Sequence, residues 1–199
     1  MPAKPWNKGK LVGPKKHLTP DHVIDIERGL KRACALRDLA LFRVGICSML
    51  RASDLVKLKT VDIAPDGTCA KRIRVRMQKT GEPVEAVLAD KTRKAVDDWL
   101  ATEAPGTWLH LFPGRDGRGH LTERQYSSLV KGWVLFADLS PADYSTHSIR
   151  RSKAAALYQA TGNMRKVQIL LGHKDITTTV RYLGVTLEDA LATAEAVVI

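Results

Sequence analysis

The sequence predicts a mainly α-helical protein with one small antiparallel β-hairpin sheet. Apolar residues recur at intervals of three and four along most of the chain, which favours helices packed on one core. Only the stretch from Arg72 to Val87 alternates with period two around a turn, which is typical of a hairpin. A chain of 199 residues suits a single domain. We therefore expect one domain at 19–199, preceded by a separate segment at 1–18.

The segment 1–18 is rich in lysine and proline and has no acidic residue. Because proline interrupts regular structure, we expect a basic flexible arm. Such an arm can lie along DNA phosphates, and a solvated tail explains the composition equally well.

Three helices are predicted before the hairpin. Thr19 is a good N-cap for a helix over 20–35, which has proline at its first position. The segment 36–49 has apolar residues on nearly every side, so we expect a second helix at the centre of the core. Ser53 and Asp54 are suited to cap a third helix that ends near residue 60.

The hairpin is expected to have one basic face. Arg72, Arg74 and Arg76 alternate with apolar residues, and a second extended run follows the connection at 80–83. Lys79 is therefore expected at or near the tip.

Helices are expected to resume after the hairpin, with a glycine-rich basic loop at 113–119. This loop lacks the preceding strand and the Gly-Lys-Ser/Thr ending of a phosphate cradle, which argues against a nucleotide site. The expected helices are 91–102, 122–138 with Thr122 as cap, a helix capped by Thr146 and ended by Gly162, 164–171 ended by Gly172, a turn beginning at Thr177, and an Ala-rich tail at 187–198.

The composition favours an acidic polymer as partner and an internal location. Lys and Arg number 32 against 21 Asp and Glu, a net charge of +11, although a basic protein without a nucleic-acid role remains an alternative. Three cysteines without C-x-x-C spacing indicate a reducing compartment. Neither a signal peptide nor an apolar run of about 18 residues is present, so we expect a cytoplasmic protein with no membrane contact.

The last third of the chain carries the chemistry. His147 and Arg150 are three apart on a predicted helix and share one face, near backbone N–H groups that would favour an oxyanion. A second imidazole, His173, directly follows the helix-ending Gly172, and Tyr182 comes soon after. An H-x-x-R pair by itself is a weak signal, typical of many surface helices.

In combination, these motifs resemble those of the tyrosine recombinase (phage integrase) family. Leu170-Leu171-Gly172-His173 and Thr178-Thr179-Val180-Arg181-Tyr182 are similar to the family patterns L-L-G-H and S/T-T-x-x-Y, and Met49-Leu50-Arg51-Ala52-Ser53-Asp54-Leu55 is similar to G-L-R-x-S/D-E-L. The resemblance covers about 19–199, the family's catalytic domain. Met49 stands where glycine is usual. The sequence shows no match to the N-terminal core-binding domain that many members have, and in this respect it resembles the short forms of the family.

The resemblance implies a role for each motif residue. Arg51 and Arg150 would bind the phosphate, with Asp54 supporting the first arginine. His147 and His173 would be the active-site histidines, Lys79 the hairpin lysine and Tyr182 the nucleophile.

The implied reaction is DNA cleavage and rejoining through a 3′-phosphotyrosyl link, without ATP, metal or another cofactor. A phenol has a pKa of about 10, so we expect the site to favour its deprotonation. Lys79 would protonate the leaving 5′ oxygen, although Lys71 and the strand arginines compete for that role.

Double-stranded DNA is the implied partner, with self-association on DNA, and accessory DNA-bending proteins are left open. The tail at 187–198 could complete the core or, as the resemblance implies, dock into a neighbouring protomer. Two rival functions remain: a non-catalytic DNA-binding regulator and a strand-nicking enzyme of the type IB topoisomerase kind. The target sequence, and the choice between integration, excision and inversion, are not encoded in any visible motif.

Overall fold

The computed structural model describes residues 15–102, 109–114, 117, 119–185, 191 and 195. Within them the chain forms helices and one two-stranded antiparallel sheet, which confirms the predicted fold class. The elements in chain order are α1 (Pro20–Arg32), α2 (Leu36–Ser48), α3 (Ala52–Leu55), α4 (Thr60–Ile63), β1 (Arg72–Arg76), β2 (Pro83–Val87), α5 (Asp90–Leu100), α6 (Glu123–Trp133), the 3-10 helix η1 (Val134–Ala137), α7 (Thr146–Thr161), α8 (Met164–Leu171) and α9 (Ile176–Leu183). None of the described helices is long and apolar enough to cross a bilayer.

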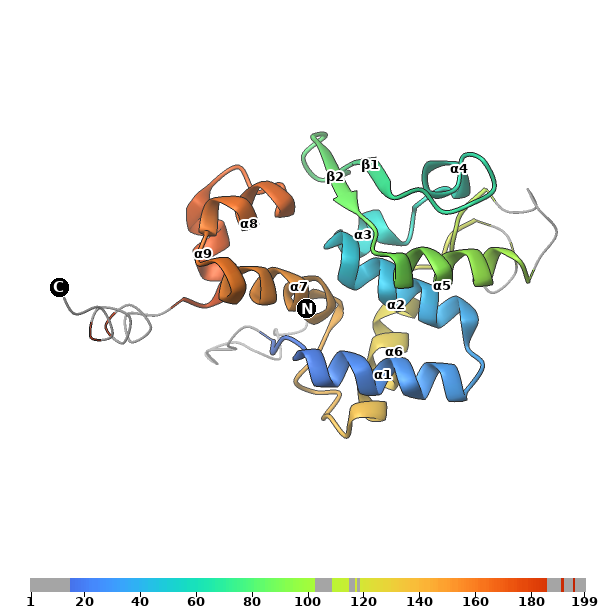
Figure 1. Ribbon diagram of the computed structural model, residues 1–199, viewed down its shortest axis with the longest axis horizontal. Helices are drawn as coiled ribbons and strands as arrows, with labels where there is room; N and C mark the ends of the chain where they lie inside the picture. The colour runs from blue at the N-terminus through green and yellow to red at the C-terminus, as the bar shows by residue number, and fades with distance from the viewer. Residues whose placement is uncertain are drawn as a thin grey trace, which may run out of the picture.

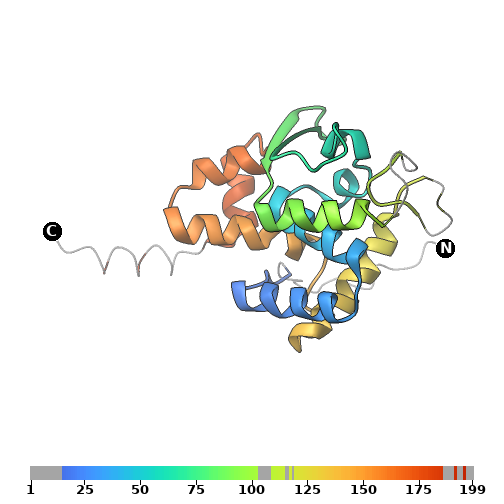
Figure 2. The same cartoon turned by 45° about the vertical axis from the view of Figure 1, so that its right-hand side comes forward.

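Helix α2 is the centre of the fold, as its apolar pattern predicted. It packs against α1, α5 and α7, and most of its side chains are buried. Figures 1 and 2 show the hairpin above α5 and the three helices α7, α8 and α9 together on one side of the molecule. The end of α2 and the start of α7 therefore meet between these parts, where the predicted site residues lie.

Two helix starts follow from the local sequence. Thr19 accepts from the His22 N–H at the start of α1, and Thr122 accepts from the Gln125 N–H at the start of α6, each within a capping box. Both predicted caps are confirmed. Helix α1 ends before the predicted residue 35 because Cys34 adopts a left-handed conformation, with φ of 50°.

The predicted third helix is wrong in its cap and its length. Two short helices, α3 and α4, replace it, and Arg51 rather than Ser53 occupies the N-cap of α3. Asp54 is buried, and its Oδ1 accepts a hydrogen bond from Gln78 N at 3.0 Å. Lys59 pairs its backbone with a distant segment, which separates α3 from α4.

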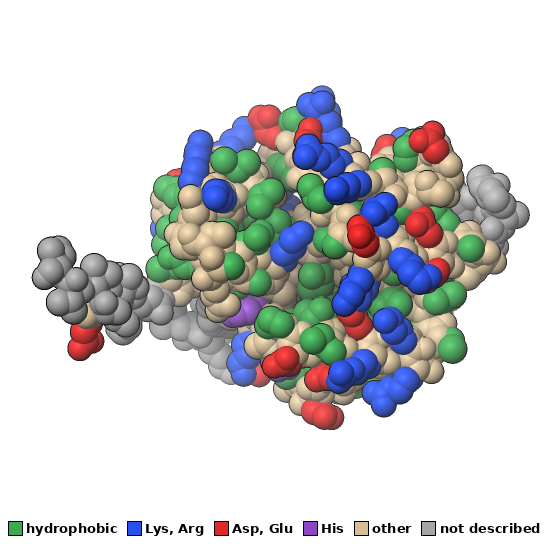
Figure 3. Space-filling view, viewed as in Figure 1, with side chains coloured by type: hydrophobic (Ala, Val, Ile, Leu, Met, Phe, Trp, Pro, Cys, Tyr) green, Lys and Arg blue, Asp and Glu red, His purple; other side chains and the backbone are tan. Residues whose placement is uncertain are grey.

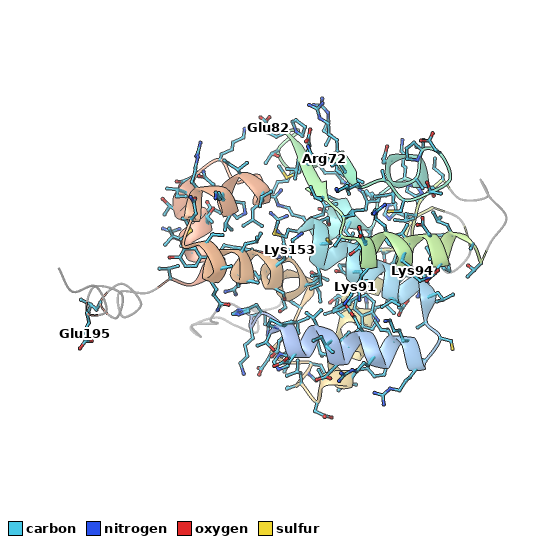
Figure 4. All side chains as sticks on the ribbon, in the orientation of Figure 1. Arg72, Glu82, Lys91, Lys94, Lys153 and Glu195 are labelled. Carbon is cyan, nitrogen blue, oxygen red and sulfur yellow. The ribbon has the colours of Figure 1, made fainter. Side chains whose placement is uncertain are left out.

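The hairpin is confirmed, and its register is set by alternating burial. Ile73 is buried, whereas Arg74 is exposed and lies opposite Glu85 in the ladder. Lys79 lies in the connection between β1 and β2, as predicted. Figure 4 shows Arg72 on this hairpin and Glu82 near its tip.

The three C-terminal helices each end at a left-handed glycine: Gly162, Gly172 and Gly184. Helix α7 begins after Ser145, one residue before the predicted cap Thr146. These helices share a small apolar cluster that also includes Met49, the residue that follows α2. Its members are Met49, Ala154, Val167 and Leu171, with Leu157, Tyr158, Tyr182 and Leu183 packed against them.

A groove of about 650 Å³ separates the hairpin from α7 and α8, and Figure 3 shows it as a hollow beside α8. Lys153 projects from α7 into this region (Figure 4), and its Nζ donates to the Cys47 carbonyl oxygen at 2.7 Å. That carbonyl belongs to the last turn of α2, where backbone oxygens lack helical partners. Lys153 therefore fastens α7 to the end of α2. The predicted tail at 187–198 lies outside the described residues, apart from 191 and 195.

Candidate active site

Four of the predicted site residues lie together around one phenol. The Tyr182 ring centroid is 5.5 Å from that of His173, in an edge-to-face arrangement. The Arg150 Cζ atom is 5.9 Å from the same ring. Arg51 is near enough for its charge to act on all three residues. Residues from α7, α9, the end of α8 and the start of α3 thus converge.

Arg150 is held rigidly from the interior of the protein. Only 4% of its surface is exposed, and its Nη2 donates to the Leu171 carbonyl oxygen at 2.8 Å. Leu171 is the last residue of α8, so this bond satisfies a carbonyl that the helix leaves free. Burial lowers the pKa of the Arg150 guanidinium, and the neighbouring Tyr182 opposes that effect.

Arg51 lies at the turn between α2 and α3. This turn starts at Met49, which adopts a left-handed conformation with φ of 54°. That conformation favours glycine, the residue that the family motif usually has at this position. Met49 therefore carries a local backbone strain of about 1 kcal/mol. Arg51 Nη1 lies 2.8 Å from the Met77 sulfur, a weak acceptor, so the guanidinium keeps donors for an anion.

His173 is oriented by the end of α8. The backbone N–H of His173 donates to the Gln168 carbonyl oxygen, and the Gln168 side chain donates to the His173 carbonyl oxygen at 3.0 Å. The His173 Nδ1 is 3.0 Å from the Thr179 hydroxyl, which is fully buried. Burial, followed by the charges of Arg150 and Arg51, lowers the pKa of His173 to about 4. The imidazole is therefore neutral at pH 7.

The Tyr182 hydroxyl is buried and has no hydrogen-bond partner among the described residues. Burial raises the pKa of the phenol to about 12, although Arg150 and Arg151 both act to lower it. The expectation that the site favours deprotonation is therefore wrong for the isolated chain. Desolvation outweighs the nearby positive charges.

His147 stands at the mouth of the site. Its side chain is exposed as a whole, yet partial desolvation and then the charge of Arg150 lower its pKa. It borders a cavity of about 370 Å³ that reaches the nucleophile candidate. The other lining residues are Lys15, Arg151, Thr178, Arg181 and Tyr182.

Asp54 does not bond to Arg51 as the motif implied. Its Oδ1 accepts instead from the backbone of Gln78, at the base of the hairpin tip, and Oδ2 is buried without a partner among the described residues. Asp54 thereby ties α3 to the segment that carries Lys79.

Lys79 is exposed and makes no hydrogen bond or ion pair with another described residue. The structure places it on the hairpin, but does not bring it into contact with Tyr182. The hairpin is linked to the loop after His173 by an ion pair of 3.5 Å between Glu82 and Lys174. Movement of the hairpin tip would change the distance between Lys79 and the other site residues.

Sequence reasoning missed three residues that support the site: Gln168, Thr179 and Arg151. Gln168 and Thr179 hold His173, whereas Arg151 contacts Tyr182 with its Cζ 5.6 Å from the ring centroid. Thr179 lies inside a matched motif, which is the one available signal. Among the described residues, no group of three or more His, Cys, Asp or Glu side chains is placed to hold a metal ion.

The sequence matches the Phage integrase family over residues 16–188. The chain therefore belongs to this family, as its motifs predicted. The tyrosine recombinase XerD of Rickettsia bellii (strain RML369-C) is 31% identical over 153 residues, which cover 72% of this chain and 50% of that protein. XerD of Bradyrhizobium diazoefficiens is 34% identical over 169 residues, covering 79% of this chain and 51% of that protein. The chain thus spans about half the length of these relatives.

Solved recombinases share the fold. The crystal structure of XerA recombinase matches with a TM-score of 0.75 at 19% identity, covering 94% of this chain and 66% of that chain. The XerH site-specific recombinase bound to its difH substrate matches with a TM-score of 0.72 at 20% identity, covering 93% and 55%.

Proposed function

We propose that this protein is a site-specific DNA recombinase or integrase that cleaves and rejoins DNA through a 3′-phosphotyrosyl intermediate. The observation that carries the proposal is the position of the Tyr182 phenol against Arg150 and Arg151 and edge-on to His173. Membership of the Phage integrase family and the similarity to XerC and XerD recombinases support it.

Arg51 and Arg150 bind the non-bridging oxygens of the scissile phosphate. These oxygens gain charge as Tyr182 attacks and phosphorus becomes five-coordinate, so fixed guanidiniums stabilise that state more than the ground state. Arg150 is suited to this role because the Leu171 carbonyl fixes its guanidinium before DNA arrives.

His173 accepts the phenolic proton, since its imidazole is neutral at pH 7. The raised pKa of Tyr182, about 12, and the lowered pKa of His173, about 4, make direct proton transfer unfavourable in the isolated chain. Burial is the largest cause of both shifts. In the isolated chain, the phenol is therefore protonated.

Lys79 protonates the leaving 5′ oxygen, and His147 assists at the mouth of the site. An exposed ammonium on a hairpin tip can reach the DNA, which the position of Lys79 allows. The reaction conserves the phosphodiester energy in the tyrosyl link, so rejoining uses the 5′ hydroxyl of a second strand and no ATP.

Double-stranded DNA is the proposed partner, and copies of the protein are proposed to associate with one another on that DNA. Residues 19–199 form the proposed catalytic domain. The net charge of +11 supports binding to a polyanion. Among proteins of the same fold, XerH was solved with its difH substrate and lambda integrase as a dimer on a core site. The tail at 187–198 is the proposed contact to a neighbouring protomer, and accessory DNA-bending proteins are compatible with this arrangement.

The test is to trap the covalent complex on a nicked suicide substrate and sequence the attached DNA. Tyr182→Phe should bind DNA but form no adduct, whereas Tyr158→Phe, a control tyrosine from the same apolar cluster, should form it. An adduct with Tyr182→Phe would mean that another nucleophile acts.

The same assay separates the rival functions. A non-catalytic regulator would form no adduct with the unmodified chain. A type IB enzyme would form the adduct but would not join two DNA molecules in new combinations. Loss of cleavage with excess EDTA, restored by magnesium, would indicate a metal-dependent nuclease instead.

A further inference from the structure

Arg151 contacts Tyr182, but the proposed reaction gives this arginine no role. It follows Arg150 on α7, and only 8% of its surface is exposed. Its Cζ lies 5.6 Å from the Tyr182 ring centroid, slightly closer than that of Arg150. A buried guanidinium over the face of an aromatic ring is attracted by the ring's electrons.

Arg151 is itself held by the segment that precedes α1. Its Nη1 donates to the Lys15 carbonyl oxygen at 2.6 Å, whereas its Nε is buried without a partner among the described residues. The contact with Lys15 therefore fixes the guanidinium. The charge of Arg151 also helps, after burial, to lower the pKa of His17, which places this segment close to the same cation.

The segment 15–18 is in turn fastened to the protein. Lys16 N donates to the Asp143 carbonyl oxygen at 3.1 Å, and Leu18 N donates to the buried Ser152 hydroxyl at 2.9 Å. Leu18 is part of the main core. The part of the predicted arm that the structure describes is thus anchored beside α7, with Lys15 lining the cavity that reaches Tyr182.

We propose that Arg151 is a positioning residue for Tyr182, and that the segment 15–18 holds Arg151 in place. The chain of contacts runs from the Lys15 carbonyl through one guanidinium to the face of the phenol ring. Displacement of this segment would then alter the reactivity of Tyr182. This inference rests on the proposed function, in which Tyr182 is the nucleophile.

The direct test measures single-turnover cleavage of a suicide substrate at saturating DNA, together with DNA affinity and thermal unfolding. Arg151→Met should slow cleavage about five- to thirtyfold with little change in affinity, the range expected for one desolvated cation–π contact. Arg151→Lys keeps the charge but loses the planar fork, and should recover part of the rate. Arg181→Met, which removes a charge from the same cavity but no contact to the ring, should lose much less.

A second variant tests the segment without touching α7. Lys16→Pro removes the N–H that donates to Asp143, so it weakens the anchoring of the segment that carries the Lys15 carbonyl. Lys16→Ala is its control, because it removes only the exposed ion pair with Asp143. We expect Lys16→Pro to slow cleavage in the unmodified chain but to add almost nothing in the Arg151→Met background.

The inference is overturned if Arg151→Met cleaves at the unmodified rate, or if the two substitutions are additive. It is also overturned if each loss of rate only follows a loss of thermal stability or DNA affinity. These outcomes presuppose an adduct with the unmodified chain. Absence of that adduct would instead contradict the proposed function.

Discussion

Gly172 is a glycine whose replacement should disturb both the fold and the candidate site. It ends α8 with φ of 62° and directly precedes His173. A Cβ atom added there would lie 2.6 Å from the Met77 Cε and 2.7 Å from the Val84 Cγ2. The Met77 methyl is the end of a flexible side chain and can turn aside. Val84 is β-branched on a strand and cannot.

Two costs of Gly172→Ala can be separated. The left-handed backbone costs an alanine about 1–2 kcal/mol, and forcing a methyl into packed atoms costs about 1–3 kcal/mol. We expect a total loss of about 2–5 kcal/mol in the free energy of unfolding. For a chain of this length, that loss lowers the unfolding midpoint by about 4–20 °C.

Gly162→Ala is the matched control, because Gly162 ends α7 with φ of 61° and has no described atom within 4 Å of the added Cβ. It should lose only the backbone part, about 1–2 kcal/mol. Urea unfolding with equal slopes for both variants measures the difference. Equal losses would refute the steric argument. Since Met77 also contacts Arg51, Gly172→Ala should slow DNA cleavage more than Gly162→Ala.

Two further predictions test individual residues. Lys79→Ala should fail to cleave ordinary DNA, because an alkoxide leaves poorly, but should cleave a substrate with sulfur at the bridging 5′ position, since a thiolate leaves unaided. Arg150→Ala should gain much less from sulfur, and equal rescue would remove Lys79 from the proton-donor role. Met49→Gly should relieve about 1 kcal/mol of backbone strain but lose a buried side chain worth about 2–5 kcal/mol. We therefore expect net destabilisation in urea, and a more stable variant would contradict the packing of Met49.

The elements that the sequence predicted well are those set by neighbouring residues. Thr19 and Thr122 start helices through bonds that span three residues, and the glycines that end α7 and α8 act on the preceding turn. The prediction of the third helix was wrong because its signals come from neighbouring residues, whereas its structure depends on contacts with distant residues. Asp54 looked like a cap, yet its carboxylate bonds to Gln78, whose place beside it depends on the hairpin.

The candidate site shows the same division between features set by neighbouring residues and features set by distant contacts. The resemblance to the family pointed to Arg51, Arg150, His173 and Tyr182 as site residues, and the fold brings them together. Their supports could not be predicted, because Arg151 is fixed by Lys15, a residue 136 positions away along the chain. A side chain that acts through such a contact carries no spacing signal.

The protonation state of the site is the clearest case in which residue types alone mislead. Guanidiniums around a phenol suggest a lowered pKa, and Arg150 and Arg151 do act in that direction on Tyr182. Burial acts in the opposite direction and is the larger effect, and burial is a property of the fold. The same burial keeps His173 neutral and able to accept a proton. In the isolated chain, the phenol is therefore protonated and lies beside a neutral imidazole.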